Sequence, residues 1–245
     1  MPGVDIHAEV GKGAWVTADA TRLQHAFQRA RFDLMALASR RALAGDIGAG
    51  NAEVKALLDA FPQARGWVVV NPAYPDRSSE EMRRYLGSAK WLGAMLNPVL
   101  CGQSLMSADS REVLNAYRRY TKPILIHTAD EPAVRELEET AKEFSTLKFI
   151  AGGGGGESWH SCLIAAKRTT NIFLEPFTGG AHRGKLEAIL ELLGAHRVLF
   201  ASGYPNLNPG AALGMLLDAK INDADKQTIL TTSSVRLFGL TRTVE

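Results

Sequence analysis

Short apolar runs rich in β-branched residues recur along the chain, and each is followed by a loop and a segment with helical spacing. The runs lie at 4–7, 32–38, 66–71, 91–96, 123–127, 147–151, 171–175 and 197–202. Several are apolar at consecutive positions, as in Ile124-Leu125-Ile126. Continuous apolar runs are typical of strands that are buried on both faces. The pattern therefore predicts eight strands in a parallel sheet.

The segments between the runs place their apolar residues on one helical face. In 131–144 this face carries Val134, Leu137, Ala141 and Phe144, and similar spacing predicts helices at 108–120, 183–193 and 223–240. No GxGxxG motif follows the first run, which argues against an open dinucleotide-binding sheet. Eight strands alternating with helices in 245 residues predict an α/β fold, a (β/α)8 TIM barrel, with residues 1–245 as a single domain.

Composition and charge agree with an ordinary folded domain. Hydrophobic residues make up 46% of the chain and charged residues 22%. Twenty-eight Lys+Arg and 26 Asp+Glu leave a formal charge of +2, so we expect neither nucleic acid nor a membrane as a partner. Basic pairs are scattered along the chain, and we interpret them as solvated helix faces: Arg40-Arg41, Arg83-Arg84, Arg118-Arg119 and Lys167-Arg168.

Two cysteines, Cys101 and Cys162, are too few for a disulfide framework or a zinc ribbon. The first residues, MPGVDIHAEV, show no basic segment followed by an apolar one, so no export signal is visible. We therefore expect a cytoplasmic protein. No GxSxG motif is present either, so serine hydrolysis is not indicated.

Polar residues cluster where the predicted strands end, which is where barrels of this kind carry their reacting groups. The first run continues as Asp5-Ile6-His7-Ala8-Glu9. Alternate residues of a strand face the same side, so His7 and Glu9 can both face the opening of the barrel. Later runs end in Asn97, His127, Glu175 and Tyr204, and five glycines at 152–156 precede Glu157.

In this order, these segments resemble the amidohydrolase superfamily, in its amidohydrolase-related branch of decarboxylases, lactonases and hydrolases. Residues 5–11 are similar to the family's opening D-x-H-x-H-x-G, and the later matching segments are GWVVVNPAYP (66–75), GAMLNP (93–98), KPILIHT (122–128), KFIAGGGGG (148–156), NIFLEP (171–176) and RVLFASGYP (197–205).

Five positions in four segments depart from the family pattern, one of them Met95 in place of the lysine of the strand-four segment. The second histidine of the opening pair is Glu9, and a strand-four segment similar to G-x-K-x-H-P has Asn97 in place of its histidine. A histidine that is common after strand six falls on Gly152 or Gly153, and the strand-eight aspartate falls on Gly203.

The resemblance implies a divalent metal ion that acidifies a water, whose proton the strand-eight aspartate accepts. With glycine in that place, the remaining candidate ligands are His7, Glu9 and His127, a set used for zinc and for non-haem iron. We expect one divalent ion, zinc first, and no residues for another cofactor. Glu175 is then the candidate catalytic residue, ahead of Glu157. The candidate substrate-binding residues are Asn97 and Tyr204.

Each candidate also has a structural interpretation. Without an ion, His7 and His127 are hydrogen-bonded residues of a polar opening, and Glu9 and Glu175 pair with cations such as Lys12, Arg183 or another arginine. The glycines at 152–156 either tolerate an unusual backbone or, with 179–180, bind a phosphate through free N–H groups.

The sequence thus leaves two main functions open. One is a metal-dependent hydrolase, or related decarboxylase or lactonase, acting on a small carboxylate, amide or lactone. The other is a catalytically inactive barrel that binds or scaffolds. The expected partner is a small-molecule substrate, and the family resemblance also allows a homodimer.

Overall fold

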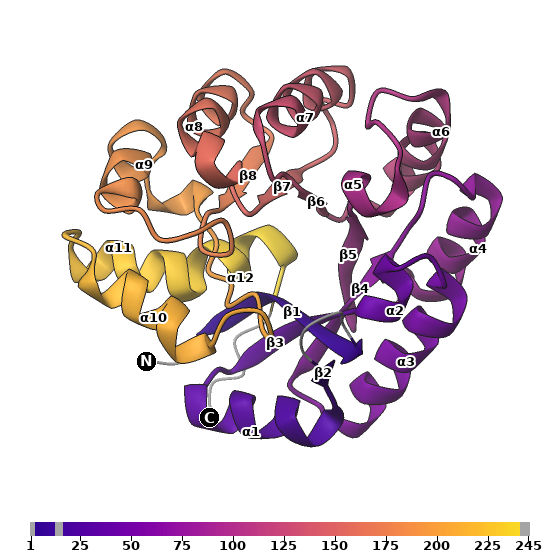
Figure 1. The fold of residues 1–245 in the computed structure, drawn as a ribbon, viewed down its shortest axis with the longest axis horizontal. Coiled ribbons are helices and arrows are strands. Elements are labelled where there is room, and N and C mark those ends of the chain that lie inside the picture. The colour runs from indigo at the N-terminus through magenta and orange to yellow at the C-terminus, as the bar shows by residue number, and fades with distance from the viewer. Residues whose placement is uncertain (1–2, 13–16, 241–245) are drawn as a thin grey trace.

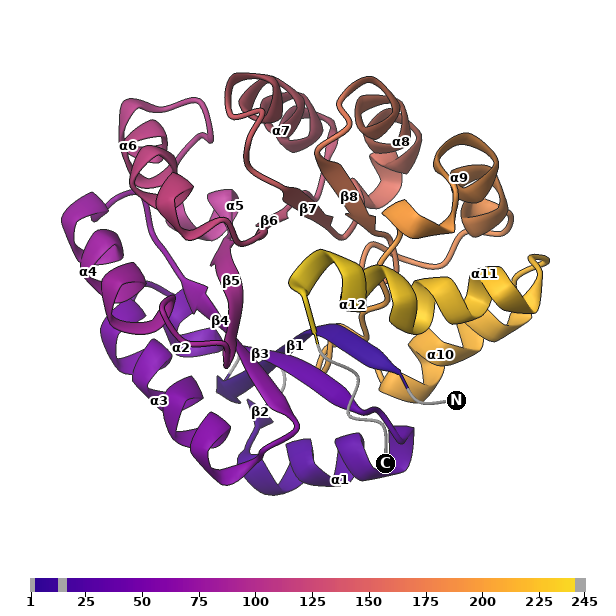
Figure 2. The ribbon, with the colours of Figure 1, turned by 180° about the vertical axis from the view of Figure 1, so that it is seen from behind.

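Parallel strands form the centre of the molecule, surrounded by helices (Figures 1 and 2). The structure is a computed structural model that describes residues 3–12 and 17–240. In the order of their pairing, the strands are β2 (Thr17–Ala18), β1 (Val4–Lys12), β3 (Leu34–Ser39), β4 (Ala64–Val69), β5 (Trp91–Leu96), β6 (Ile124–His127), β7 (Phe149–Gly152) and β8 (Ile172–Glu175). Among the described residues, β2 pairs antiparallel with the end of β1, and the other strand pairs of this sheet are parallel.

Residues 198–204 close the barrel between β8 and β1 without forming a regular ladder. Val198 forms an isolated parallel bridge with Leu174 of β8, and Tyr204 forms one with Ala8 of β1. Backbone hydrogen bonds to β1 lie between these two bridges. The run predicted at 197–202 therefore occupies the place of the eighth barrel strand, and the predicted TIM barrel is confirmed.

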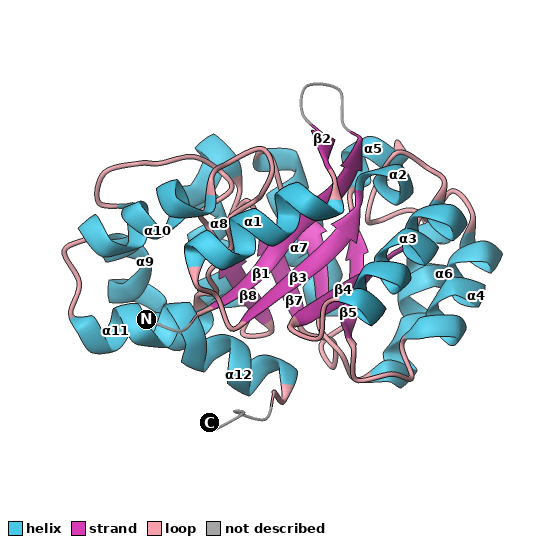
Figure 3. Ribbon diagram, turned by 90° about the horizontal axis from the view of Figure 1, so that it is seen from below, coloured by secondary structure: helices cyan, strands magenta, loops and turns pink. Residues whose placement is uncertain are grey.

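Helices cover the outer surface of the strands (Figure 3). They are α1 (Ala20–Ala30), α2 (Arg40–Leu43), α3 (Ile47–Ala60), α4 (Pro75–Tyr85), α5 (Pro98–Cys101), α6 (Ala108–Tyr117), α7 (Glu131–Glu143), α8 (Trp159–Arg168), α9 (Lys185–Leu193), α10 (Pro209–Asp218), α11 (Asp223–Gln227) and α12 (Ser233–Phe238). The predicted helices at 108–120, 131–144 and 183–193 correspond to α6 with a following 3-10 turn, α7 and α9. The single helix predicted at 223–240 is instead α11 and α12, separated by a π-helical turn.

Both faces of the sheet are buried, which explains the continuous apolar runs. One cluster fills the inside of the barrel with residues from successive strands, such as Ile6, Trp67, Leu125 and Leu199. A second, larger cluster packs the outer face of the strands against the helices. Burial on both faces removes the polar alternation that a one-sided sheet would show.

An irregularity in β1 decides which of its side chains enter the barrel. The pairing of β1 with β3 shifts register between Asp5 and Ala8. Ile6, within the shifted stretch, belongs to the interior cluster, and Ala8, at its end, belongs to the outer one. Strict alternation from Ile6 would turn His7 outward, but the bulge turns it inward, so His7 and Glu9 both face the interior.

Candidate metal centre

A cavity of about 720 Å³ opens at the carboxyl ends of the strands. His7, Glu9, His127 and Asn97 line it. Much of its wall is apolar and comes from Val99, Leu100, Phe177, Leu207 and Met215. The cavity therefore combines a few convergent polar groups with an apolar surface, which is the usual make-up of a small-molecule site.

The three predicted ligands lie together at the floor of this cavity. One potential ligand atom from each of His7, Glu9 and His127 lies within 4.8 Å of the other two. His7 Nε2 is 3.6 Å from Glu9 Oε1, and the two imidazole rings meet edge to face with their centroids 5.0 Å apart. The structure thus brings together the three side chains that the sequence selects from β1 and β6.

His7 lies between two carboxylates. Its Nδ1 is 3.6 Å from Glu175 Oε2, and its Nε2 faces Glu9. Burial disfavours a charged imidazole, but the two carboxylates outweigh it and raise the pKa of His7 to about 10. A ligating histidine commonly holds a carboxylate at its second nitrogen, because this fixes the tautomer and the ring orientation. Glu175 lies on the Nδ1 side of His7 as an ion-pair partner, but at 3.6 Å it forms no hydrogen bond with that nitrogen.

His127 presents a neutral imidazole to the cavity. Burial, together with the positive charge on His7, lowers the pKa of His127 to about 4. Its Nε2 is buried and has no hydrogen-bond partner within the described part of the chain. A buried nitrogen with a free lone pair is costly unless something binds it, so this atom indicates a ligand.

Glu9 is held by an arginine that the sequence did not single out. Arg40 Nε donates to Glu9 Oε2 at 3.0 Å, and the side chains are only 10% and 11% exposed. Burial opposes ionisation, but His7, His127 and Arg40 lower the pKa of Glu9 to about 2. The interpretation of Arg40-Arg41 as a solvated pair is therefore wrong for Arg40, although the neighbouring arginine is 54% exposed.

Glu175 is fully buried and serves as an acceptor for several groups. Its Oε1 accepts from the backbone N–H of Phe177 (2.9 Å) and Thr178 (3.1 Å), and its Oε2 accepts from the Gly153 N–H (3.0 Å) and the Thr178 hydroxyl (2.6 Å). These four donors, with His7 beside them, use the acceptor capacity of both oxygens. Glu175 thus joins the loops after β7 and β8 to β1.

The position of the family's strand-eight aspartate is filled from another loop. Gly203 has φ +64°, and a Cβ built on it would lie 2.5 Å from Thr178 Cγ2. Thr178 follows β8 and is fixed through its hydroxyl to Glu175. The space that a side chain at 203 would need is therefore occupied by Thr178.

The glycines at 152–156 form a tightly packed turn. Gly153, Gly154, Gly155 and Gly156 all have positive φ, and their N–H groups donate to Glu175 Oε2 and to the carbonyls of Ala151, Thr128 and Gly153. Four N–H groups used inside the protein leave no nest for a phosphate there, so this alternative is wrong for residues 153–156. Glycine is required by the backbone conformation and by close packing.

The remaining candidates lie apart from the ligand cluster. Asn97 lines the cavity, and its Oδ1 caps α5 by accepting from the Leu100 N–H. Tyr204 is not among the residues that line the cavity, but its carbonyl accepts from the Glu9 N–H at 2.7 Å. Glu157 is 90% exposed and faces His182, which explains why it is the poorer candidate for moving protons.

The donor set fits one divalent cation. Two imidazoles and one carboxylate are a recognised catalytic ligand set, and all three are buried or nearly so. Ligand distances of 2.0–2.2 Å around zinc place tetrahedral donors about 3.4 Å apart, close to the 3.6 Å between His7 Nε2 and Glu9 Oε1. The unpaired Nε2 of His127 completes the set.

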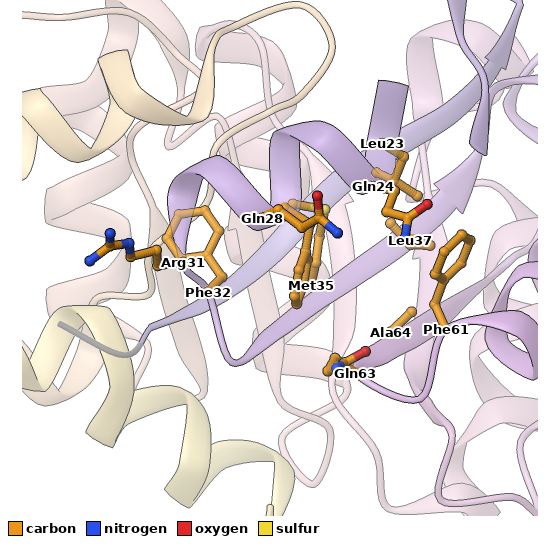
Figure 4. Close-up of a pocket in the computed structure, with 11 residues that line it drawn as sticks. Leu23, Gln24, Gln28, Arg31, Phe32, Met35, Leu37, Phe61, Gln63 and Ala64 are labelled. Carbon is orange, nitrogen blue, oxygen red and sulfur yellow. The ribbon is translucent and has the colours of Figure 1, made fainter. Parts of the chain in front are cut away.

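A second, smaller cavity lies on the outer side of the barrel. It has a volume of about 250 Å³ and is lined by α1, β3 and the turn before β4 (Figure 4). Its floor is apolar, with Leu23, Met35 and Leu37, and its rim carries Gln24 and Gln28. None of the predicted site residues lines it.

No helix within residues 3–12 and 17–240 is long and apolar enough to cross a membrane.

Comparisons with known proteins found solved structures with the same barrel fold. Similar structures include dihydroxybenzoic acid decarboxylase from Polaromonas sp. JS666, solved with manganese and the inhibitor 2-nitroresorcinol (14% identity, TM-score 0.80, 98% of each chain covered). Another is 5-carboxyvanillate decarboxylase from Sphingomonas paucimobilis (15% identity, TM-score 0.77, 98% of this chain and 99% of that one). A third is 2,6-dihydroxybenzoate decarboxylase from Rhizobium (14% identity, TM-score 0.78, 97% and 98% covered).

At these identities the solved structures establish the barrel fold alone. No curated protein matches the chain. The sequence profile of the amidohydrolase family, however, matches residues 16–240, which is most of the chain. The chain therefore belongs to the amidohydrolase family.

Proposed function

We propose that the protein is a metal-dependent enzyme in which His7, Glu9 and His127 hold one divalent ion. The reaction is hydrolysis or a related decarboxylation or lactone opening of a small carboxylate, amide or lactone. The observation that carries the proposal is the buried ligand cluster at the floor of the cavity, with His127 Nε2 left without a partner. The bound ion would acidify a water or polarise the substrate carbonyl or carboxylate.

Different residues around the cavity would position the ligands and contact the substrate. Glu175 faces the Nδ1 side of His7 as an opposite charge, and Nε2 faces Glu9. Phe177, Leu207 and Met215 offer an apolar wall for the body of the substrate. No lysine or arginine is found among the described residues that line the cavity. A substrate carboxylate would therefore be matched by the ion.

Zinc is the first candidate from the donor types. Manganese is the second, supported by the manganese in the decarboxylase from Polaromonas. Glu175 stays a predicted catalytic residue, but its four donors support a positioning role toward His7. A carboxylate whose lone pairs are all engaged is a poor proton acceptor.

Metal binding by wild type and His127→Ala tests the proposal. Purified, metal-depleted protein is titrated with Zn²⁺ and Mn²⁺ by calorimetry. We expect one ion per chain for wild type and a loss of more than about 100-fold in affinity for the variant, because changing only the hydrogen-bond partner of a ligand already costs about 10- to 100-fold. His25→Ala, a change at an exposed histidine, is the matched control. Equal binding by wild type and His127→Ala would show that the cluster is not the metal site.

A second function, an inactive barrel that binds or scaffolds, is favoured by the charge balance of the site. Without an ion, Arg40 and protonated His7 match the two carboxylates of Glu9 and Glu175. Gly203 also supplies no acidic group. This function predicts that wild type binds neither Zn²⁺ nor Mn²⁺ at millimolar concentration. The same titration therefore separates the two proposals.

A further inference from the structure

The contact between Glu9 and Arg40 is a feature of the site that the family resemblance does not account for. Arg40 Nε donates to Glu9 Oε2 at 3.0 Å. A second guanidinium nitrogen donates to Asn206 Oδ1, so Arg40 spans from β1 to the loop that follows the last barrel strand. Both charged groups are about nine-tenths buried. Such a pair is screened little by solvent.

The backbone fixes the place of Arg40. Val10 pairs with Ser39 in the β1–β3 ladder, so Arg40 follows at the level of Gly11. Gly11 has φ +102°, and a Cβ there would lie 3.8 Å from Arg40 Cβ. Ser39 caps α2 by accepting from the Ala42 N–H at 3.3 Å. The arginine therefore starts from a defined turn rather than from a mobile loop.

The pair restricts what Glu9 can offer to a cation. Oε2 is occupied by the guanidinium, and Oε1 faces His7 Nε2 at 3.6 Å. Only Oε1 is thus directed toward the ligand cluster. The guanidinium keeps its charge throughout the range in which proteins fold, and a fixed positive charge on a ligand opposes a second cation on that ligand.

We propose that Arg40 competes with the divalent cation for the carboxylate of Glu9. It limits Glu9 to one ligating oxygen, weakens cation binding, and keeps the carboxylate in place when no cation is bound. The proposal rests on the proposed metal site, and Arg40 is a positioning residue in it. Its effect is expected in opposite directions on metal affinity and on the stability of the metal-free protein.

Titration of metal-depleted protein with Mn²⁺ tests this, using wild type, Arg40→Met and Arg41→Met. We expect Arg40→Met to bind Mn²⁺ about tenfold or more tightly, because a nearby fixed positive charge is removed. Its metal-free melting temperature should fall, because Glu9 loses its buried partner. Arg41→Met is the matched control, since Arg41 pairs with Asp46 at the surface, and should leave both values unchanged.

Two further variants separate charge from geometry. Arg40→Lys keeps the positive charge but loses the planar guanidinium with its several donors. The affinity of this variant for Mn²⁺ should therefore stay near that of wild type. Glu9→Gln combined with Arg40→Met should abolish the gain, because the gain requires the carboxylate. If Arg40→Met does not fold, Arg40→Gln is used instead, because glutamine can still donate a hydrogen bond to Glu9 but carries no charge.

The outcomes distinguish this inference from the proposed function. Weaker or unchanged Mn²⁺ binding in Arg40→Met, with wild type binding one ion, would overturn the competitor role and leave the metal site intact. Binding by Arg40→Met but not by wild type would support the competitor role and refute a metal-loaded wild-type enzyme. Absence of binding in both would overturn both.

Discussion

Replacing Gly203 by alanine tests why the counterpart of the family's strand-eight aspartate carries no side chain. The change places a Cβ 2.5 Å from Thr178 Cγ2 at a residue with φ +64°. The left-handed backbone costs about 1–2 kcal/mol for a residue with a Cβ. Overlap in a packed site costs about 1–3 kcal/mol more. We expect Gly203→Ala to lower the free energy of unfolding by about 2–5 kcal/mol.

Thr178→Ser separates the two contributions. Serine lacks the Cγ2 methyl but keeps the hydroxyl that donates to Glu175. The nearest remaining side-chain atom would be Cβ of residue 178, at 3.3 Å from the added Cβ, a tight but tolerable contact. In the Thr178→Ser background, Gly203→Ala should therefore cost only the backbone strain of about 1–2 kcal/mol.

Urea denaturation of wild type, both single variants and the double variant measures the coupling. The expected coupling free energy is about 1–3 kcal/mol, within the range for residues in contact. Equal costs of Gly203→Ala in both backgrounds would refute the claim that Thr178 fills this space. The same reasoning predicts that Gly203→Asp is better tolerated with Thr178→Ser than alone.

Three other predictions concern His7 and the carboxylates around it. Cation binding at pH 8 should release close to one proton, because the pKa of His7 is about 10 and ligation needs neutral imidazole. Calorimetry in buffers of different ionisation enthalpy counts the released protons. A count near zero would contradict the role of His7 as a ligand. In the metal-free protein, this raised pKa contributes stability below about pH 6.5 that is lost as the pH rises through about 10, which urea midpoints would show. Glu175→Gln should lower the free energy of unfolding by about 2–4 kcal/mol, because an amide NH₂ would face hydrogen-bond donors. Glu157→Gln, at an exposed glutamate, should change it little, and equal losses would argue against a special role for Glu175.

The barrel could be predicted from the sequence because its strands are buried on both faces. The continuous apolar runs and the helical spacing between them indicate strands and helices that are kept in the folded protein. The π-helical turn at Thr228–Thr232 could not be predicted, since apolar spacing looks the same on both sides of it. The bulge in β1 was equally hidden, because it is set by pairing with β3. His7 faces inward only through that bulge.

The ligand cluster could be predicted because carboxyl ends of parallel strands converge at one end of a barrel. The partners of those ligands could not, because they depend on contacts between distant segments. Arg40 lies 31 positions from Glu9, and its sequence context is a doublet that suggests solvent exposure. Thr178 lies in a loop with no motif, and only the packing of Gly203 shows what it does.

The departures from the family pattern are matched by residues elsewhere in the chain. Glu9, in place of an imidazole, is neutralised by Arg40. Gly203, in place of an aspartate, leaves the space that Thr178 fills. Loss of function without repacking would leave an unpaired buried carboxylate and a void, both of which cost stability. Here, instead, the Glu9 carboxylate has a cationic partner and the place of a side chain at 203 is occupied, while the cavity itself stays open. Within the described part of the chain, both ring nitrogens of His7 and the Nε2 of His127 have no hydrogen-bond partner, and we infer that binding at these imidazoles is what the rest of the site is arranged to allow.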